Sequence, residues 1–166
     1  MNKQEAIQNV VDNSIPSYLR IANIFELMNI ADTNSIQALH KVIENESCEL
    51  VRHEAIFALG EMAPGRNTIE FLKKTIQSDD SYVVQHEALI AIGTVGEKED
   101  ISFLESFVTH PDFEIQCSAK IGIQRLTQKQ GFEDKIKNNL EHYKKYLFDY
   151  INSCLLYTSD AADEED

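Results

Sequence analysis

Two stretches of this sequence decide its fold: "ELVRHEAIFALGEM" at residues 49–62 and "YVVQHEALIAIGTV" at residues 82–95. They align without gaps, and each carries a His-Glu pair at the same position. In the first stretch the apolar residues recur every three or four positions, which is the spacing of one face of an α-helix. They are Val51, Ala55, Ala58, Leu59 and Met62. The two stretches are therefore predicted to be helices in equivalent positions of a repeat.

Weaker copies flank these two helices. The segment 17–30, "SYLRIANIFELMNI", precedes the first stretch and matches it, and the segment 113–126, "FEIQCSAKIGIQRL", follows the second and matches that one. The four copies succeed one another at nearly equal spacing. A period of roughly 30 residues is typical of helical repeat proteins, in which each unit buries its apolar face against its neighbours.

A shorter amphipathic segment precedes each of the last three copies. These segments are 35–43, 68–76 and 101–108, and turn-prone residues such as Pro64-Gly65 and Pro111-Asp112 separate the units. No strand-like alternation competes with the helical pattern. The sequence predicts an all-α fold, an α-solenoid of about four helical hairpins followed by a C-terminal helix.

Three regions are expected along the chain. Residues 1–130 form the repeat domain, and residues 131–153 form a terminal or linker helix, since apolar residues recur at helical spacing between Ile136 and Ile151. Residues 154–166, beginning "CLLYTSDAADE", resemble the translation of a sequencing adapter. We expect this tail to be non-native and disordered, and the natural reading frame to continue beyond Ser153.

Composition narrows the class of protein. Of the 166 residues, 43% are hydrophobic and 26% charged, with a net charge of −13, which disfavours binding to nucleic acid. No run approaches the ~20 apolar residues of a membrane span, so no membrane partner is expected. The three cysteines are far apart and odd in number, which favours a reducing compartment. The expected location is the cytoplasm.

The chemistry lies in the two His-Glu pairs. Equivalent residues of neighbouring repeats are adjacent in space, because packed helices lie roughly 8–10 Å apart. His53-Glu54 and His86-Glu87 should therefore meet on one surface. Two imidazoles with carboxylates and no thiolate suit iron, manganese or zinc, and an open site of this kind favours iron or manganese.

Two other interpretations of these pairs exist. The zinc-protease motif HExxH needs a second histidine one turn later, where this chain has Phe57 and Ile90. A single His-Glu pair near a helix N-terminus is usually structural. However, the flanking copies have Ile21-Ala22 and Cys117-Ser118 at this position, so the repeat packs without His-Glu. The remaining histidines (His40, His110 and His142) do not recur in register, and we expect them to be solvated or capping.

The pattern of "LVRHEAIFALGEM" and "VVQHEALIAIGTVG" between degenerate copies resembles the N-terminal half of the deoxyhypusine hydroxylase family, over roughly residues 15–127. That resemblance implies a HEAT-repeat solenoid and an iron-dependent monooxygenase with a di-iron centre. The substrate would be the deoxyhypusine side chain of a translation initiation factor. It also implies metal ligation by His53, His86 and Glu87. Glu54 would be either a further ligand or a catalytic acid facing the amines of the substrate.

The family has four His-Glu motifs and this chain has two, half of the expected ligand set. A chain of natural half length would need to form a homodimer to complete such a centre. The alternative function is that of a metal-free HEAT-repeat scaffold that binds a protein partner, such as a bilin-lyase-like HEAT protein. Further His-Glu motifs encoded beyond Ser153 would favour the hydroxylase, whereas a stop codon there would favour the scaffold or the dimer.

Overall fold

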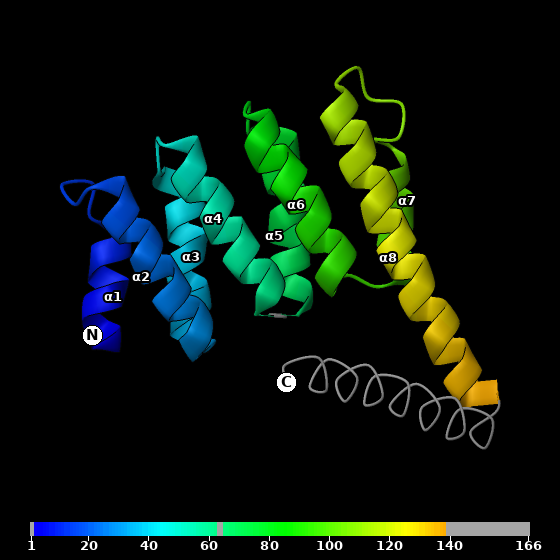
Figure 1. The fold of residues 1–166 in the computed structure, drawn as a ribbon, viewed down its shortest axis with the longest axis horizontal. Helices are drawn as coiled ribbons and strands as arrows, with labels where there is room; N and C mark the ends of the chain where they lie inside the picture. The colour runs from blue at the N-terminus through cyan, green and yellow to red at the C-terminus, as the bar shows by residue number, and fades with distance from the viewer. Residues whose placement is uncertain (1, 63–64, 139–166) are drawn as a thin grey trace, which may run out of the picture. The chain divides into compact units, whose positions relative to one another are not determined.

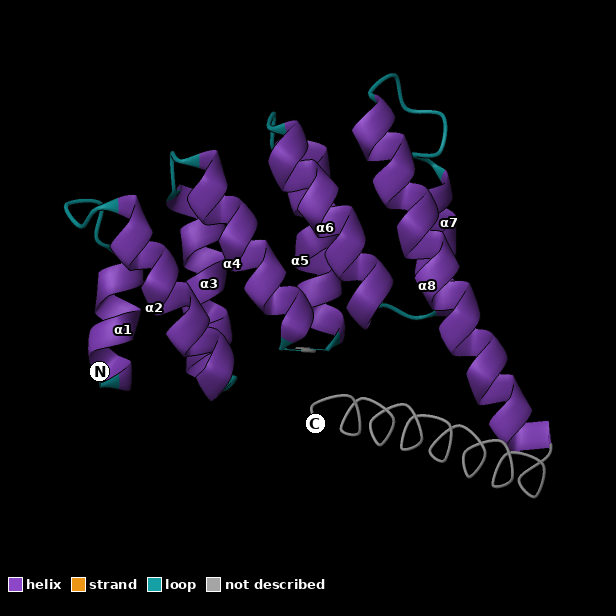
Figure 2. Ribbon diagram, viewed as in Figure 1, coloured by secondary structure: helices purple, strands orange, loops and turns teal. Residues whose placement is uncertain are grey.

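The computed structural model describes residues 2–62 and 65–138, and for residues 132–138 it describes the backbone alone. Every regular element in these ranges is helical (Figure 2), which confirms the predicted all-α class. The predictions for residues 139–153 and for the tail 154–166 lie outside the described residues. The chain forms two compact units, Met1–Thr127 and Gln128–Asp166.

The first unit is a row of helical hairpins (Figure 1). In chain order its helices are α1 (Lys3–Val11), α2 (Ser17–Ile30), α3 (Thr33–Asn45), α4 (Glu49–Glu61), α5 (Arg66–Ser78), α6 (Tyr82–Val95), the 3₁₀ turn η1 (Lys98–Asp100), α7 (Ile101–Glu105) and the beginning of α8 (Phe113–Asn138). The four sequence copies lie on α2, α4, α6 and α8. Each is the second helix of its hairpin, and the α-solenoid prediction is confirmed.

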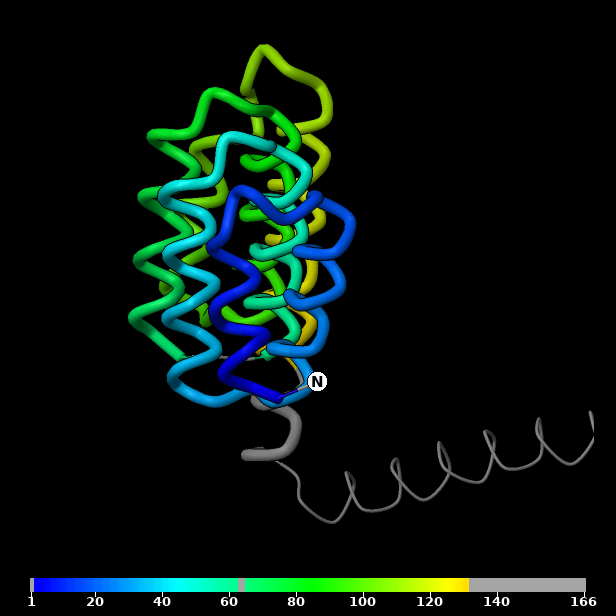
Figure 3. Tube along the Cα trace, turned by 90° about the vertical axis from the view of Figure 1, so that its left-hand side faces the viewer, coloured from blue at the N-terminus to red at the C-terminus, as the bar shows by residue number. Residues whose placement is uncertain are grey.

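The hairpins stack so that equivalent helices are neighbours. Helix α4 packs against both α2 and α6, and it also contacts its hairpin partner α3. Viewed along the stack, the first helices form one layer and the second helices another (Figure 3). The two His-Glu pairs, on α4 and α6, are therefore on adjacent helices of the same layer.

The core lies between the two layers. The predicted apolar face of α4 is buried as expected: Val51, Ala55, Ala58 and Leu59 are fully enclosed, and only Met62 is half-buried. The same positions recur as Val84, Ala88, Ala91 and Ile92 on α6. Since each helix buries one face against its hairpin partner and another against the next repeat, its stability depends on both neighbours.

The helix ends differ in several places from the predicted segments. Helix α3 begins at Thr33, because the Asp32 side chain accepts a hydrogen bond from the Ser35 backbone N–H. Helix α5 begins at Arg66 after Gly65, whose φ of +85° suits glycine. Both helices therefore begin shortly before their predicted segments. Helix α7 is shorter than predicted, and α8 continues past Gln130, where we expected the repeat helix to end.

An arginine immediately before the His-Glu position joins each of the first two repeats to the next. Arg20 on α2 forms a buried ion pair with Glu46, which caps α3. Arg52 on α4 forms a bidentate ion pair with Asp79, where α5 ends. Its Nε and Nη2 atoms donate to the two carboxylate oxygens at 2.8 and 2.9 Å. Paired guanidinium–carboxylate bonds are directional, so they fix the rotation of one repeat against the next. Arg52 is adjacent in sequence to His53, and this contact fixes the place of α4 in the stack.

Candidate metal centre

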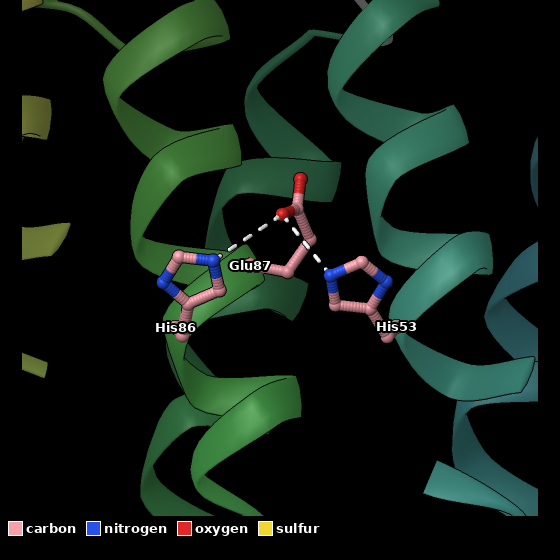
Figure 4. A group of neighbouring side chains, drawn as sticks. All are labelled: His53, His86 and Glu87. Carbon is pink, nitrogen blue, oxygen red and sulfur yellow. Dashed lines mark ion pairs between the residues drawn. The ribbon is translucent and has the colours of Figure 1, made fainter. Parts of the chain in front are cut away.

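His53 and His86 lie opposite one another on α4 and α6 (Figure 4). Their rings are nearly parallel, with an interplanar angle of 6° and a centroid separation of 6.4 Å. The two residues come from equivalent positions of adjacent repeats, and the α4–α6 packing described above brings them together. The structure thus places the two histidines in the arrangement that the repeat predicts.

Glu87 reaches into the space between the two rings (Figure 4). Its Oε2 atom is 3.4 Å from His53 Nε2 and 3.9 Å from His86 Nε2. One donor atom from each of the three residues lies within 4.8 Å of the other two. The side chain of Glu87 is 10% exposed, whereas that of His86 is 39% exposed. The group therefore has a buried acidic side and a side open to solvent.

The outer nitrogen of each ring has its own partner. Nδ1 of His53 is 3.3 Å from Oε1 of Glu54, and Nδ1 of His86 is 2.6 Å from Oγ of Ser118 on α8. An imidazole that donates its Nδ1 proton to such a partner presents the lone pair of Nε2 on its other side. Both Nε2 atoms are turned towards Glu87, so both rings are set for binding a cation there.

Electrostatics distinguishes His53 within the group. Its pKa is raised above the ordinary imidazole value, chiefly by the hydrogen bond to Glu87, with the charge of Glu54 adding to the effect and burial opposing it. A histidine between two carboxylates is in a strongly cation-favouring position. The same field that attracts a proton attracts a metal ion.

The donor set fits a divalent metal ion. Ligand atoms bound at about 2.0–2.2 Å from an ion lie no more than about 4.4 Å apart, and the two distances to Glu87 are already within that limit. Two imidazoles and one carboxylate on one side of an ion, with open positions on the other, are typical of non-haem iron sites. His53, His86 and Glu87 would hold such an ion.

Comparison with known proteins agrees with this architecture. A model of HEAT repeats matches residues 5–93 and again residues 36–124. The chain belongs to the HEAT-repeat family. Among solved structures, it is similar to human deoxyhypusine hydroxylase in complex with glycerol, with a TM-score of 0.72 and 24% sequence identity. That match covers 78% of this chain and 44% of the human chain, so the HEAT-repeat protein spans less than half of that length. No curated protein sequence gives a significant match.

These comparisons confirm the resemblance drawn from the sequence at the level of fold. At 24% identity, the likeness establishes a HEAT solenoid like that of the hydroxylase. In the described ranges, no helix of this HEAT-repeat protein has the length and apolar content needed to cross a bilayer.

Three of the four predicted site residues lie together in the structure, and the fourth does not. His53, His86 and Glu87 form the group, while Glu54 lies on the outer side of His53 and is not part of it. The role of Glu54 as a ligand or catalytic acid stays a prediction. Ser118, which sequence reasoning did not select, contacts the group directly.

The histidines outside the group make other contacts. His40 stacks on Phe71 with ring centroids 4.0 Å apart and is half-buried, so the expectation of a solvated or capping residue is wrong for it. His110 accepts a hydrogen bond from the Asp112 backbone N–H in the turn before α8, which is a capping role. His142 is outside the described residues.

Proposed function

We propose that this HEAT-repeat protein is an iron-dependent oxygenase of the deoxyhypusine hydroxylase type, or the half of one that holds the first set of ligands. Its substrate would be the deoxyhypusine side chain of a translation initiation factor in the cytoplasm. The observation that carries the proposal is the His53–Glu87–His86 group, built from one position of two adjacent repeats on a fold similar to that of the human hydroxylase.

Each residue of the group has a distinct task in this proposal. His53 and His86 supply neutral nitrogen donors from the two helices, and Glu87 supplies an anionic oxygen between them (Figure 4). When bound there, iron would supply the activation of dioxygen that no amino-acid side chain can perform. Manganese and zinc are the alternative ions for the same donors.

The surroundings suit a cationic substrate. Glu54 is half-buried beside His53, and its carboxylate would pair with an amine of the substrate. His86 is the more exposed of the two rings, so the substrate would approach from its side of the group. The net charge of −13 favours encounter with a positively charged partner.

Metal analysis tests the proposal. We expect the protein, purified and loaded with Fe²⁺ under anaerobic conditions, to retain iron through gel filtration. His53→Ala and His86→Ala should lose it, and His110→Ala, which alters a histidine outside the group, should retain it. Iron no higher in the wild type than in the His53→Ala/His86→Ala double variant would refute a metal function and favour the metal-free scaffold.

A second test concerns the missing half of the ligand set. The gene downstream of Ser153 should encode two further His-Glu motifs, with the same spacing that separates His53 from His86 in the present repeat. If a native stop codon follows instead, the iron-loaded protein should form a homodimer in sedimentation experiments. If the gene encodes no further His-Glu motifs and the protein forms no dimer, the ligand set stays incomplete and the hydroxylase proposal fails.

A further inference from the structure

Ser118 is a buried serine on α8, in one of the two copies of the repeat that have no His-Glu pair. It occupies the position equivalent to Glu87, one repeat later, and is 1% exposed. Its hydroxyl oxygen lies 2.6 Å from Nδ1 of His86. The repeat that lacks a predicted ligand therefore contacts one of the candidate ligands.

The direction of this hydrogen bond follows from the second contact of Ser118. The hydroxyl oxygen is also 2.6 Å from the backbone carbonyl oxygen of Glu114, one turn earlier on α8. A carbonyl cannot donate, and a hydroxyl has one proton, so the Ser118 proton goes to the Glu114 carbonyl. The contact with His86 is then satisfied only if the imidazole Nδ1–H donates to Ser118.

This assignment determines which nitrogen of His86 is free. With the proton on Nδ1, the neutral ring has its lone pair on Nε2, the atom that faces Glu87. The separation of 3.9 Å between His86 Nε2 and the Glu87 carboxylate is consistent with two acceptors that share no proton. His53 is closer to the same carboxylate, at 3.4 Å.

We propose that Ser118 is a positioning residue of the metal centre, which holds the His86 ring in the Nδ1–H form and orients Nε2 towards Glu87. His53 has an anionic partner on its outer nitrogen, whereas His86 has a neutral one, so the two rings are held by chemically different supports. The fourth repeat is thus part of the site although it contributes no ligand. The tautomer of His86 is a property of the metal-free chain. Only the expected effect of Ser118 on metal affinity rests on the proposed function.

The tautomer can be measured without any metal. Long-range ¹H–¹⁵N spectra of the histidine rings, recorded at about pH 8.5 and so well above the ordinary imidazole pKa of ~6.5, should show His86 as the Nδ1–H form. Ser118→Ala should shift His86 towards the Nε2–H form that free imidazole side chains prefer, and Ser118→Thr should restore the original signal. A wild-type His86 in the Nε2–H form, or no change in Ser118→Ala, overturns the proposal.

Metal affinity gives the second readout. Loss of a partner on the outer nitrogen of a ligand histidine weakens binding by roughly 10–100-fold, so Ser118→Ala should lower Co²⁺ affinity by that factor. The matched control is Thr75→Val, which removes another buried hydroxyl bonded to the carbonyl one turn earlier, with no histidine involved. Equal losses in the two variants would overturn the positioning role. A wild type that binds no metal overturns the proposed function instead, and the spectra then decide the role of Ser118.

Discussion

Gly93 on α6 and Gly122 on α8 approach one another so closely that a Cβ atom on Gly93 would lie 2.3 Å from the Cα atom of Gly122. No side chain can move aside there, because the obstacle is backbone. Gly93 is two helical turns beyond His86, and Gly122 is one turn beyond Ser118. The contact between the glycines therefore sets the distance between the helices that carry the His86–Ser118 hydrogen bond.

Gly93→Ala should consequently destabilise the protein by about 1–3 kcal/mol, the usual cost of overpacking a core. Urea unfolding measures the change. Gly60→Ala is the matched control, because Gly60 is the equivalent residue of the preceding repeat and its added Cβ would meet the methyl group of Ala91 at 3.2 Å, a looser contact. Gly60→Ala should lower the free energy of unfolding by less than Gly93→Ala does. An unchanged midpoint for Gly93→Ala would contradict the close approach.

Glu54 and Glu87 should respond differently to neutralisation. Glu87 is in the ligand group, so Glu87→Gln should abolish metal binding, whereas Glu54 contacts the outer nitrogen of His53. Glu54→Gln should therefore retain the metal with an affinity lower by roughly 10–100-fold. Titration with Co²⁺ separates the two cases. Complete loss in Glu54→Gln would show that Glu54 is itself a ligand.

Asp100 should be an acid outside the site to whose removal the fold is sensitive. Its fully buried carboxylate accepts hydrogen bonds from the Arg66 guanidinium and the Glu97 backbone N–H, and it lies 2.7 Å from Lys73 Nζ. Asp100→Ala leaves the Glu97 N–H without its acceptor and leaves Arg66 and Lys73 with only the exposed Glu70 as an acidic partner among the described residues, at an expected cost of about 1–3 kcal/mol in unfolding free energy. Glu70→Ala removes an exposed partner of the same arginine and should change little. Similar losses in both variants would contradict a buried anchor.

Stability should depend on His40 in mildly acidic solution. Burial lowers the pKa of His40, and the nearby Glu44 only partly offsets this. The unfolded chain then binds a proton at about pH 6.5, before the folded chain does, so the stability contribution of the neutral ring is lost as the pH falls below about 6.5. Between pH 7.5 and 5.5, His40→Gln should lose less stability than the wild type in urea unfolding.

The raised pKa of His53 has the opposite effect on stability, which is lost as the pH rises through that pKa. This contribution is present in both the wild type and His40→Gln, so it cancels in the comparison. An identical pH dependence of the two proteins would show that burial does not hold His40 neutral.

Much of the fold could be predicted because the repeat pattern is redundant. The apolar positions of α4 and α6 recur with one period, so a single alignment fixes both the helices and their neighbours. The ends of the helices were harder to predict from the sequence. The start of α3 depends on a hydrogen bond from Ser35 to Asp32, and that of α5 on the backbone of Gly65, and neither follows from apolar periodicity.

The site was predictable where two copies carry the same letters, as with His53 and His86. Ser118 was missed for the same reason. In an alignment, Cys117-Ser118 reads as the loss of His-Glu, whereas in space it is one repeat further along the same surface. A search for hydroxyls one period away from a ligand histidine would have found it. The stacking of His40 on Phe71 has no comparable signal, because Phe71 recurs as Phe103 but Lys73 stands where His40 would recur.

The candidate ligands His53 and Glu87 lie on different repeats, which the chain joins through α5. An ion held by both would thus form a further link between two units that already meet through apolar packing and the Arg52–Asp79 ion pair. Bending of the solenoid between these two repeats would change the distances to the ion, and ion binding would in turn oppose the bending, since such coupling is reciprocal. The stiffness of the repeat array and the metal occupancy of the site are therefore coupled, so a measurement of either one reports a change in the other.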